Sequence, residues 1–192
     1  VSLDRRFADQ PLVATDHFDG SGQVADHLYQ LGHRRIAYIA GPQNMEVARQ
    51  RQDGFVSRIK ALSSDWDPIE LTVFEGQFDY ESGEELGRKL LNPRQQALRP
   101  TAIAAASDQQ AIGVLRSAQD LKLNIPEDLS VAGFDDISLA SLVVPRLTTV
   151  RQPIEELAAS SVSRIFEEGL AGSDIAIAGE IIARESTAPA GD

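Results

Sequence analysis

The chain has 192 residues, with 42% hydrophobic and 24% charged side chains, which is enough for one domain with a real core or for two small lobes. Its net charge of −11 argues against a broad contact with a phosphate backbone, because such a contact needs clustered Lys and Arg. The absence of cysteine excludes disulfides, thiol catalysis and thiolate metal sites, and it fits a reducing compartment.

Short apolar runs alternate with segments of helical periodicity along the whole chain. The runs predict strands at residues 12–15, 36–40, 69–74, 101–106, 130–134, 147–150 and 180–183. Between the strands, apolar faces predict helices, marked by Val24, Leu28 and Leu31; by Phe55, Ile59 and Leu62; by Leu86 and Leu90; and by Ile112, Leu115 and Ala118. This alternation is typical of an α/β fold with parallel sheets covered by helices on both faces.

The two ends of the chain carry their own signals. Residues 1–3 resemble the end of a strand that runs directly into a loop, so we expect the chain to be a truncated piece of a longer protein. In the last and clearest helix, one face carries Ile154, Leu157, Ser161, Ile165 and Phe166. This helix is expected to begin at Pro153 and to end at Gly169 or Gly172, and residues 187–192 are expected to form a loose tail.

The polar and aromatic residues that follow the strands are the candidates for a ligand site, because ligands of open α/β sheets bind beyond the carboxyl ends of the strands. They are Asp4, Arg51, Phe78, Ser107, Asp108, Asp135, Asp136 and Gln152. Carboxylates, one guanidinium, an amide, a hydroxyl and a ring together suit a small polyhydroxylated or polar ring compound.

Each candidate also has a purely structural interpretation. The alternatives are helix capping for Ser107, Asp135, Asp136 and Gln152; a surface ion pair with Asp53 or Glu46 for Arg51; core packing for Phe78; and a solvated end for Asp4. The position that these residues share, at strand ends, is the stronger observation.

Cofactor binding and catalysis find little support. Residues 20–25, GSGQVA, match a dinucleotide-binding fingerprint, but the next strand ends in AGPQN at 40–44 without the carboxylate that such a site needs. The histidines His17, His27 and His33 show no metal-ligand spacing, and no nucleophile elbow is present. We therefore expect no cofactor, no metal, no catalytic residues and no enzyme activity.

Several stretches have a characteristic order and spacing: LYQLGHRRIA at 28–37, RQDGF at 51–55, SDQQAIG at 107–113, IPEDLSVAGFDD at 125–136, PRLTTV at 145–150 and ARES at 183–186. Together they resemble the lactose-repressor/galactose-repressor (LacI/GalR) family of bacterial transcription regulators. The resemblance covers essentially all 192 residues.

The resemblance implies a two-lobed fold like that of type I periplasmic binding proteins, with three crossovers between the lobes. Residues 18–150 would form the C-terminal lobe, and residues 1–16 and 152–178 would be a remnant of an incomplete N-terminal lobe. Residues 179–192 would be the final strand and tail.

The resemblance also assigns roles to single residues of this sequence. It implies that the effector cleft contains its arginine at Arg51, its aspartate at Asp135 and its stacking aromatic ring at Phe78. Ser107 stands where the family often has asparagine, which shortens one hydrogen-bonding side chain. The family's effector contacts match Asp4 and Gln152 less securely, and Asp136 is expected to point elsewhere.

The implied function is the effector-binding and dimerisation domain of a cytoplasmic repressor. Its effector would be a sugar, a sugar phosphate or a similar ring compound, and its operator DNA would be bound by a headpiece absent from this chain. A homodimer is expected, and no membrane contact, since no apolar run approaches the roughly 20 residues of a membrane span. The alternative is a periplasmic sugar-binding protein of a transporter, which a signal sequence instead of a helix-turn-helix upstream of Val1 would reveal.

Overall fold

The computed structural model describes residues 2–3, 12–168 and 173–191. Its larger part is built on a parallel sheet of four strands in the order β4-β3-β5-β6. The strands are β3 (Arg35–Ala40), β4 (Glu70–Glu75), β5 (Ala102–Ala105) and β6 (Ser130–Ala132). The three strands β3, β5 and β6 are buried almost throughout, as expected for strands that helices cover on both faces.

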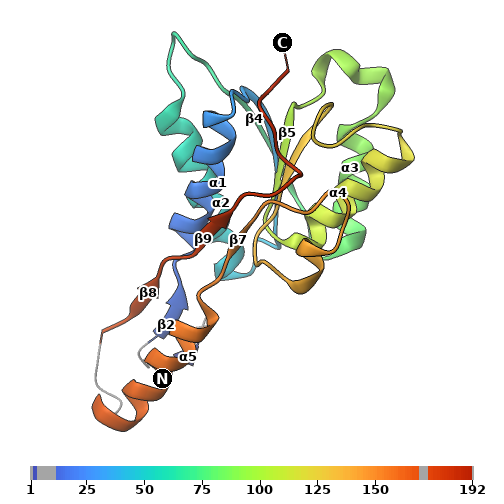
Figure 1. Ribbon diagram of the computed structural model, residues 1–192. Coiled ribbons are helices and arrows are strands. Elements are labelled where there is room, and N and C mark those ends of the chain that lie inside the picture. Colours follow the sequence, from blue (N-terminus) through green and yellow to red (C-terminus); the bar gives the residue numbers. More distant parts are fainter. Residues whose placement is uncertain (1, 4–11, 169–172, 192) are drawn as a thin grey trace.

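Two helices cover each face of this sheet (Figure 1). On one face, α1 (His17–Gln30) and α2 (Glu46–Leu62) pack on the strands through a core that includes Leu28 and Phe55. On the other, α3 (Tyr80–Leu90) and α4 (Asp108–Asp120) pack through a second core that includes Val114. Because α2 and α4 follow β3 and β5, they begin at the carboxyl edge of the sheet.

Two further strands continue the sheet beside β6. β7 (Thr149–Arg151) pairs antiparallel with β9 (Glu180–Ile182). Single bridges join Thr148 to Ala132 and Arg151 to Asp135, so β7 runs parallel to the end of β6 and to the turn after it.

A smaller sheet extends away from this body (Figure 1). It consists of β1 (Ser2–Leu3), β2 (Leu12–Thr15) and β8 (Ile175–Ile177), all parallel, and α5 (Ile154–Ser163) contacts β2. The chain runs from β2 into α1, from β7 into α5 and from β8 into β9. The division into lobes near residues 16, 152 and 178 stays a prediction.

All seven predicted strands are present, with ends that differ by up to two residues. The short strand β8 was not predicted from the sequence. The glycines of the GSGQVA segment lie inside α1, where a Cβ on Gly20 would lie 3.0 Å from the Phe134 ring. They therefore permit close helix–sheet packing rather than a phosphate-binding turn.

The prediction of a loose C-terminal tail is wrong for the described residues 187–191. The Thr187 hydroxyl lies 2.9 Å from His27 Nε2, and the Ala188 carbonyl lies 3.1 Å from His33 Nε2. Ala190 N donates to Leu31 O over 2.7 Å. These bonds tie the segment to the end of α1, and they give His33 a structural role.

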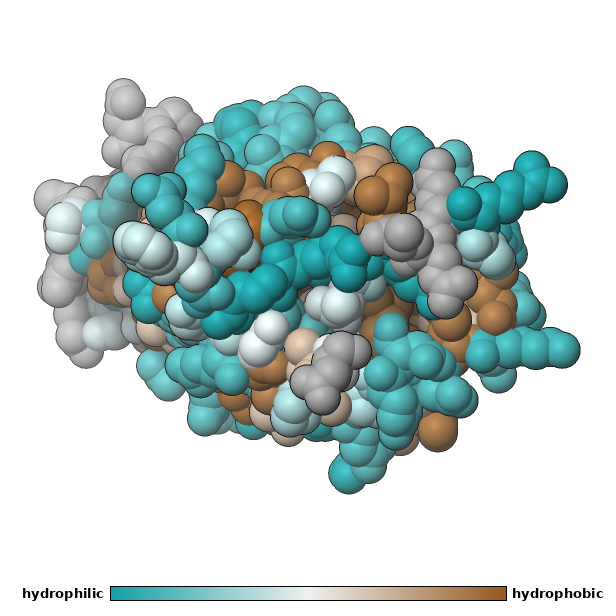
Figure 2. Space-filling model, turned by 90° about the horizontal axis from the view of Figure 1, so that it is seen from above, coloured by the Kyte–Doolittle hydropathy of each residue, from teal (hydrophilic) through white to brown (hydrophobic). Residues whose placement is uncertain are grey.

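The last helix is present, but its apolar face is largely exposed. Leu157 is buried, whereas Ile154, Ile165 and Phe166 are 57–82% exposed. The predicted helix ends at Gly169 and Gly172 lie outside the described residues. None of the described helices is both long and apolar enough to cross a membrane, and the face seen in Figure 2 is mostly hydrophilic.

Candidate effector site

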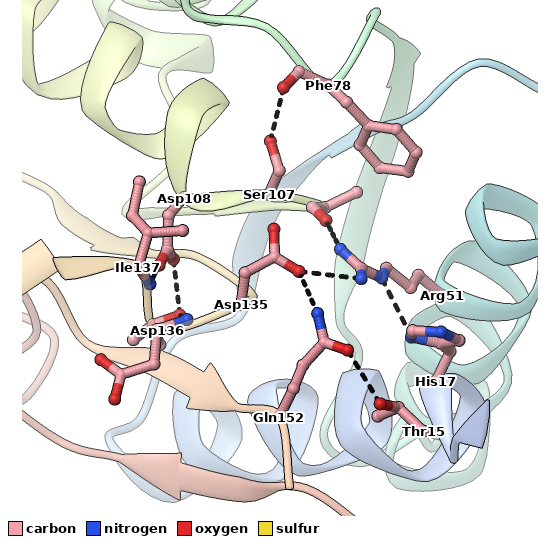
Figure 3. Close-up of polar contacts among 12 residues, drawn as sticks. Thr15, His17, Arg51, Phe78, Ser107, Asp108, Asp135, Asp136, Ile137 and Gln152 are labelled. Atoms are coloured by element: carbon pink, nitrogen blue, oxygen red, sulfur yellow. Dashed lines mark hydrogen bonds and ion pairs between the residues drawn. The ribbon is translucent and has the colours of Figure 1, made fainter. Parts of the chain in front are cut away.

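Arg51 lies at the centre of the candidate site, at the carboxyl edge of the main sheet (Figure 3). It comes from α2, is only 5% exposed and makes polar contacts with three described residues. Nη1 donates to Ala106 O over 2.6 Å, Nη2 lies 2.8 Å from Asp135 Oδ1, and Nε donates to His17 Nδ1 over 3.3 Å. The alternative of a surface pair with Asp53 or Glu46 is therefore wrong.

Asp135 and Gln152 continue this network toward the smaller sheet. Gln152 Nε2 donates to Asp135 Oδ1 over 2.7 Å, and the Thr15 hydroxyl donates to Gln152 Oε1 over 2.8 Å. The cap of α5 is Pro153, which makes no side-chain bond, so Gln152 does not cap that helix. Within the described part of the chain, the second Asp135 oxygen makes no hydrogen bond (Figure 3).

Ser107 and Phe78 form the opposite border of the site. Ser107 caps α4 by accepting from Gln110 N, as its sequence motif predicts, and its hydroxyl also donates to Phe78 O over 3.1 Å. The Phe78 ring packs partly on the core and lies 5.5 Å from the Arg51 guanidinium. A Cβ on Gly41 would lie 2.2 Å from Phe78 Cζ, so this ring position depends on a glycine.

Strained backbone gathers around the same residues. Phe78, Asp135 and Asp136 have positive φ angles of 63°, 120° and 52°. In the described chain, Lys122 is the one other non-glycine residue with a positive φ. Such conformations cost roughly 1–3 kcal/mol each and are concentrated at ligand-binding sites.

Asp136 points away from Arg51, as expected (Figure 3). It lies 2.7 Å from Arg151 Nε and 2.5 Å from Arg184 Nη2. Although burial opposes ionisation, hydrogen bonds from these two arginines lower the pKa of Asp136. It caps no helix, because the cap of the short helix after it is Ile137.

Two further residues contact the site and were not among the candidates predicted from the sequence. Thr15 bonds to Gln152 and His17 bonds to Arg51, and their position at the end of β2 and just after it was the available signal. Asp108 was expected only as one of the strand-end candidates for ligand contact. That residue is fully buried under the turn at Asp135 and Asp136.

One predicted residue cannot be placed, since Asp4 lies outside the described residues. Among the described side chains, no group of three His, Cys, Asp or Glu could hold a metal ion. Two surface grooves of about 480 and 460 Å³ lie elsewhere, along α4 and between α1 and α2.

Residues 25–187 match the periplasmic binding protein-like domain family. The ribose operon repressor of Escherichia coli is 35% identical over 78% of this chain and 45% of its own length. The repressor CytR of the same species is 34% identical over 82% of this chain and 45% of its own length. The chain thus spans about half the length of the curated relatives it matches.

Solved structures that resemble this chain are also transcription regulators of the LacI type. A LacI family regulator from Enterococcus faecium, with bound ribose, has a TM-score of 0.83 and 30% identity over 97% of this chain and 69% of its own. A dimeric Lac repressor has a TM-score of 0.85 and 30% identity over 98% of this chain and 68% of its own. These relatives are transcription regulators rather than enzymes or transport proteins, as the sequence analysis predicted. The chain therefore belongs to the LacI family of transcriptional regulators and contains their periplasmic binding protein-like domain.

Proposed function

We propose that this chain binds a small sugar-like effector through Arg51, Phe78, Ser107, Asp135 and Gln152, with Asp4 as a further contact. The observation that carries the proposal is the ion pair between the buried Arg51 and the partly exposed Asp135, held at the strand ends beside strained turns. Among the described residues, Arg51 donates hydrogen bonds to His17 and Ala106 and pairs with Asp135, and its remaining N–H groups would donate to ligand oxygens. The free Asp135 oxygen accepts from a hydroxyl, and the Phe78 ring covers an apolar sugar face.

The hydrogen bonds between Asp135, Gln152 and Thr15 suggest how effector binding affects the rest of the protein. Gln152 and Thr15 lie where the chain passes between the two sheets. A ligand bound to Asp135 would therefore be connected by hydrogen bonds to the segments that link the two sheets. With residues 18–150 as one lobe and residues 1–16 and 152–178 as part of the other, effector binding would change the angle between lobes. Effector and operator affinities would then be coupled, typically by about 1–3 kcal/mol.

The two ribose-related comparisons make D-ribose the first probe. We expect D-ribose, or another member of a panel of sugars and sugar phosphates, to raise the melting temperature of the full-length protein. Since a ligand that binds only the folded state stabilises it by about 2.7 kcal/mol at a hundred times its Kd, the shift should be several degrees. A panel with no effect at millimolar concentration would count against a sugar effector.

We propose that operator DNA is bound outside this chain, in the cytoplasm. At a net charge of −11, the chain alone should show no sequence-selective binding in a gel-shift assay at physiological salt. The full-length protein, tested on the same DNA, is the positive control. Tight selective binding by the chain alone would contradict this assignment.

We also propose a two-fold symmetric homodimer. Support comes from Val144, which lines the groove along α4 and is 93% exposed, and from Leu142 two residues before it, which is 72% exposed. Val144→Asp should shift the full-length protein toward monomer in sedimentation experiments at micromolar concentration. Trp66→Asp, which changes an equally exposed residue elsewhere, should not. A parent protein that sediments as a monomer would refute the dimer.

A further inference from the structure

Three consecutive backbone N–H groups hold the turn that carries the Asp135 carboxylate. Asp135 N donates to a main-chain carbonyl of β7 over 2.9 Å. Asp136 N donates to Thr149 Oγ1 over 3.4 Å, and Ile137 N donates to Asp108 Oδ2 over 2.9 Å. Two side chains, Thr149 and Asp108, therefore hold the second and third of these groups.

The turn needs such support because its backbone is strained. Asp135 has a φ of 120° and Asp136 a φ of 52°, both in the region that disfavours residues with a Cβ. Strain of this kind persists only where the surrounding structure enforces it. Removing a side-chain partner would let the turn relax, and the Asp135 carboxylate would move with it.

Thr149 and Asp108 also bond to each other. The Thr149 hydroxyl donates to Asp108 Oδ1 over 2.5 Å, and both side chains are fully buried. Asp108 is the first residue of α4, and Thr149 is the first residue of β7. A Cβ on Gly133 would lie 2.3 Å from Asp108 Oδ1, so the carboxylate is enclosed by backbone as well. The Asp108–Thr149 pair, called the brace below, therefore connects α4 and β7 to the turn at residues 135–137.

We propose that Asp108 and Thr149 are positioning residues for the Asp135 carboxylate, and that ionisation of Asp108 makes effector affinity depend on pH. The proposal rests on the effector role proposed for Asp135. Neither residue needs to touch the ligand, since both act through the backbone of the turn.

The electrostatic surroundings place this ionisation near neutrality. Burial raises the pKa of Asp108 to about 7, against the opposing effect of the hydrogen bonds from Thr149 and Ile137 N. The neighbouring carboxylates of Asp135 and Asp136 raise it further.

Other charges that face the turn are already paired. Arg51 forms an ion pair with Asp135, and Arg151 and Arg184 form ion pairs with Asp136. These arginines stay charged at any pH at which the protein is folded, and His17, which accepts from Arg51 Nε, is the other ionisable side chain that contacts the network.

The hydrogen bonds of Asp108 determine whether effector affinity rises or falls with pH. An ionised Asp108 accepts from both Thr149 and Ile137 N, which fixes the turn. A protonated Asp108 donates its proton to Thr149, so the Thr149 hydroxyl loses its acceptor and the brace loosens. The effector should therefore bind with its full affinity well above pH 7, where Asp108 is ionised. The affinity should fall by about three- to tenfold as the pH drops through 7, which is the change expected for the loss of one hydrogen bond.

Calorimetric titration of the full-length protein with D-ribose, between about pH 5.5 and 8.5, tests the functional half of the proposal. The parent should show the fall, and Asp108→Asn should bind at the parent's low-pH affinity throughout, without a pH dependence. Thr149→Val should bind weakly, and Thr149→Ser, which keeps the hydroxyl, should restore parental binding. An Asp108→Asn protein with the parental affinity and pH profile would overturn the proposal.

Nuclear magnetic resonance of the ligand-free protein tests the brace itself. The amide resonances of Asp136 and Ile137 should titrate with a midpoint near pH 7 in the parent and not in Asp108→Asn. Absence of this titration in the parent overturns the proposal, whether or not any variant folds. If the titration is present but D-ribose does not bind, or Arg51→Ala binds it as the parent does, the proposed effector function fails and the brace stands.

Discussion

Arg51→Ala and Asp135→Ala are each expected to weaken D-ribose binding by roughly tenfold to more than a hundredfold. Each change removes charge-assisted hydrogen bonds to ligand oxygens shielded from water, and such bonds contribute about 1.5–3 kcal/mol each. Arg51→Lys should also bind weakly, because an ammonium group cannot satisfy Ala106, His17 and Asp135 together as the planar guanidinium does. Phe78→Ala should cost less, through lost stacking on the sugar face.

The matched control is Arg49→Ala, which changes the same residue type two positions earlier on α2. Arg49 is exposed and pairs with Glu46, so its loss should leave ribose affinity unchanged. Asp136 is a poor control, because it joins Arg151 and Arg184 and its loss would strand two cations. Each variant is compared by circular dichroism first, since removing Arg51 leaves Asp135 without its cation. Parental affinity in both Arg51→Ala and Asp135→Ala would show that the site is wrongly assigned.

Gly54→Ala is expected to lower the free energy of unfolding by about 1–3 kcal/mol, the usual cost of overpacking. A Cβ on Gly54 would lie 2.1 Å from the Phe18 carbonyl oxygen, so α2 would have to move away from α1. Because His17 on α1 bonds to Arg51 on α2, the same shift should also weaken ribose binding. Chemical denaturation and calorimetry measure the two effects.

Gly22→Ala provides the opposite control on the partner helix. A Cβ there would meet only Arg58 Cβ, at 3.9 Å, which is ordinary contact. Replacing a helical glycine by alanine without a clash should stabilise the protein by about 0.5–1 kcal/mol and leave ribose binding unchanged. If Gly54→Ala is as stable as Gly22→Ala, the two helices are not packed as closely as described.

The sheet and its helices could be predicted because their signals are local. Apolar runs mark the buried strands, and Ser107 begins a recognisable capping box. The short strand β8 lacks a comparable signal, since its three residues are ordered by pairing with β2, about 160 positions away in sequence. The C-terminal segment shows no periodicity either, because it is held by single bonds to His27, His33 and Leu31.

The candidate site was predictable only in part for the same reason. The order of the strands brings Arg51, Ser107 and Asp135 to one edge of the sheet, which the sequence indicates. The burial of Arg51 could not be predicted from the sequence, because its neighbours Gln50 and Gln52 are typical of the exposed face of a helix. The role of Asp108 is hidden behind its place in a capping box, since its bonds reach forward to the turn at Ile137 and to β7.

The crystal structure of the full-length protein with D-ribose, or with the panel sugar that stabilises it most, is the most direct test of the proposed effector site. The sugar hydroxyls should lie within hydrogen-bonding distance of Arg51 and of the free Asp135 oxygen, with the Phe78 ring against the sugar face. A sugar bound elsewhere, such as in the groove along α4, with the Arg51–Asp135 pair unchanged, would contradict it.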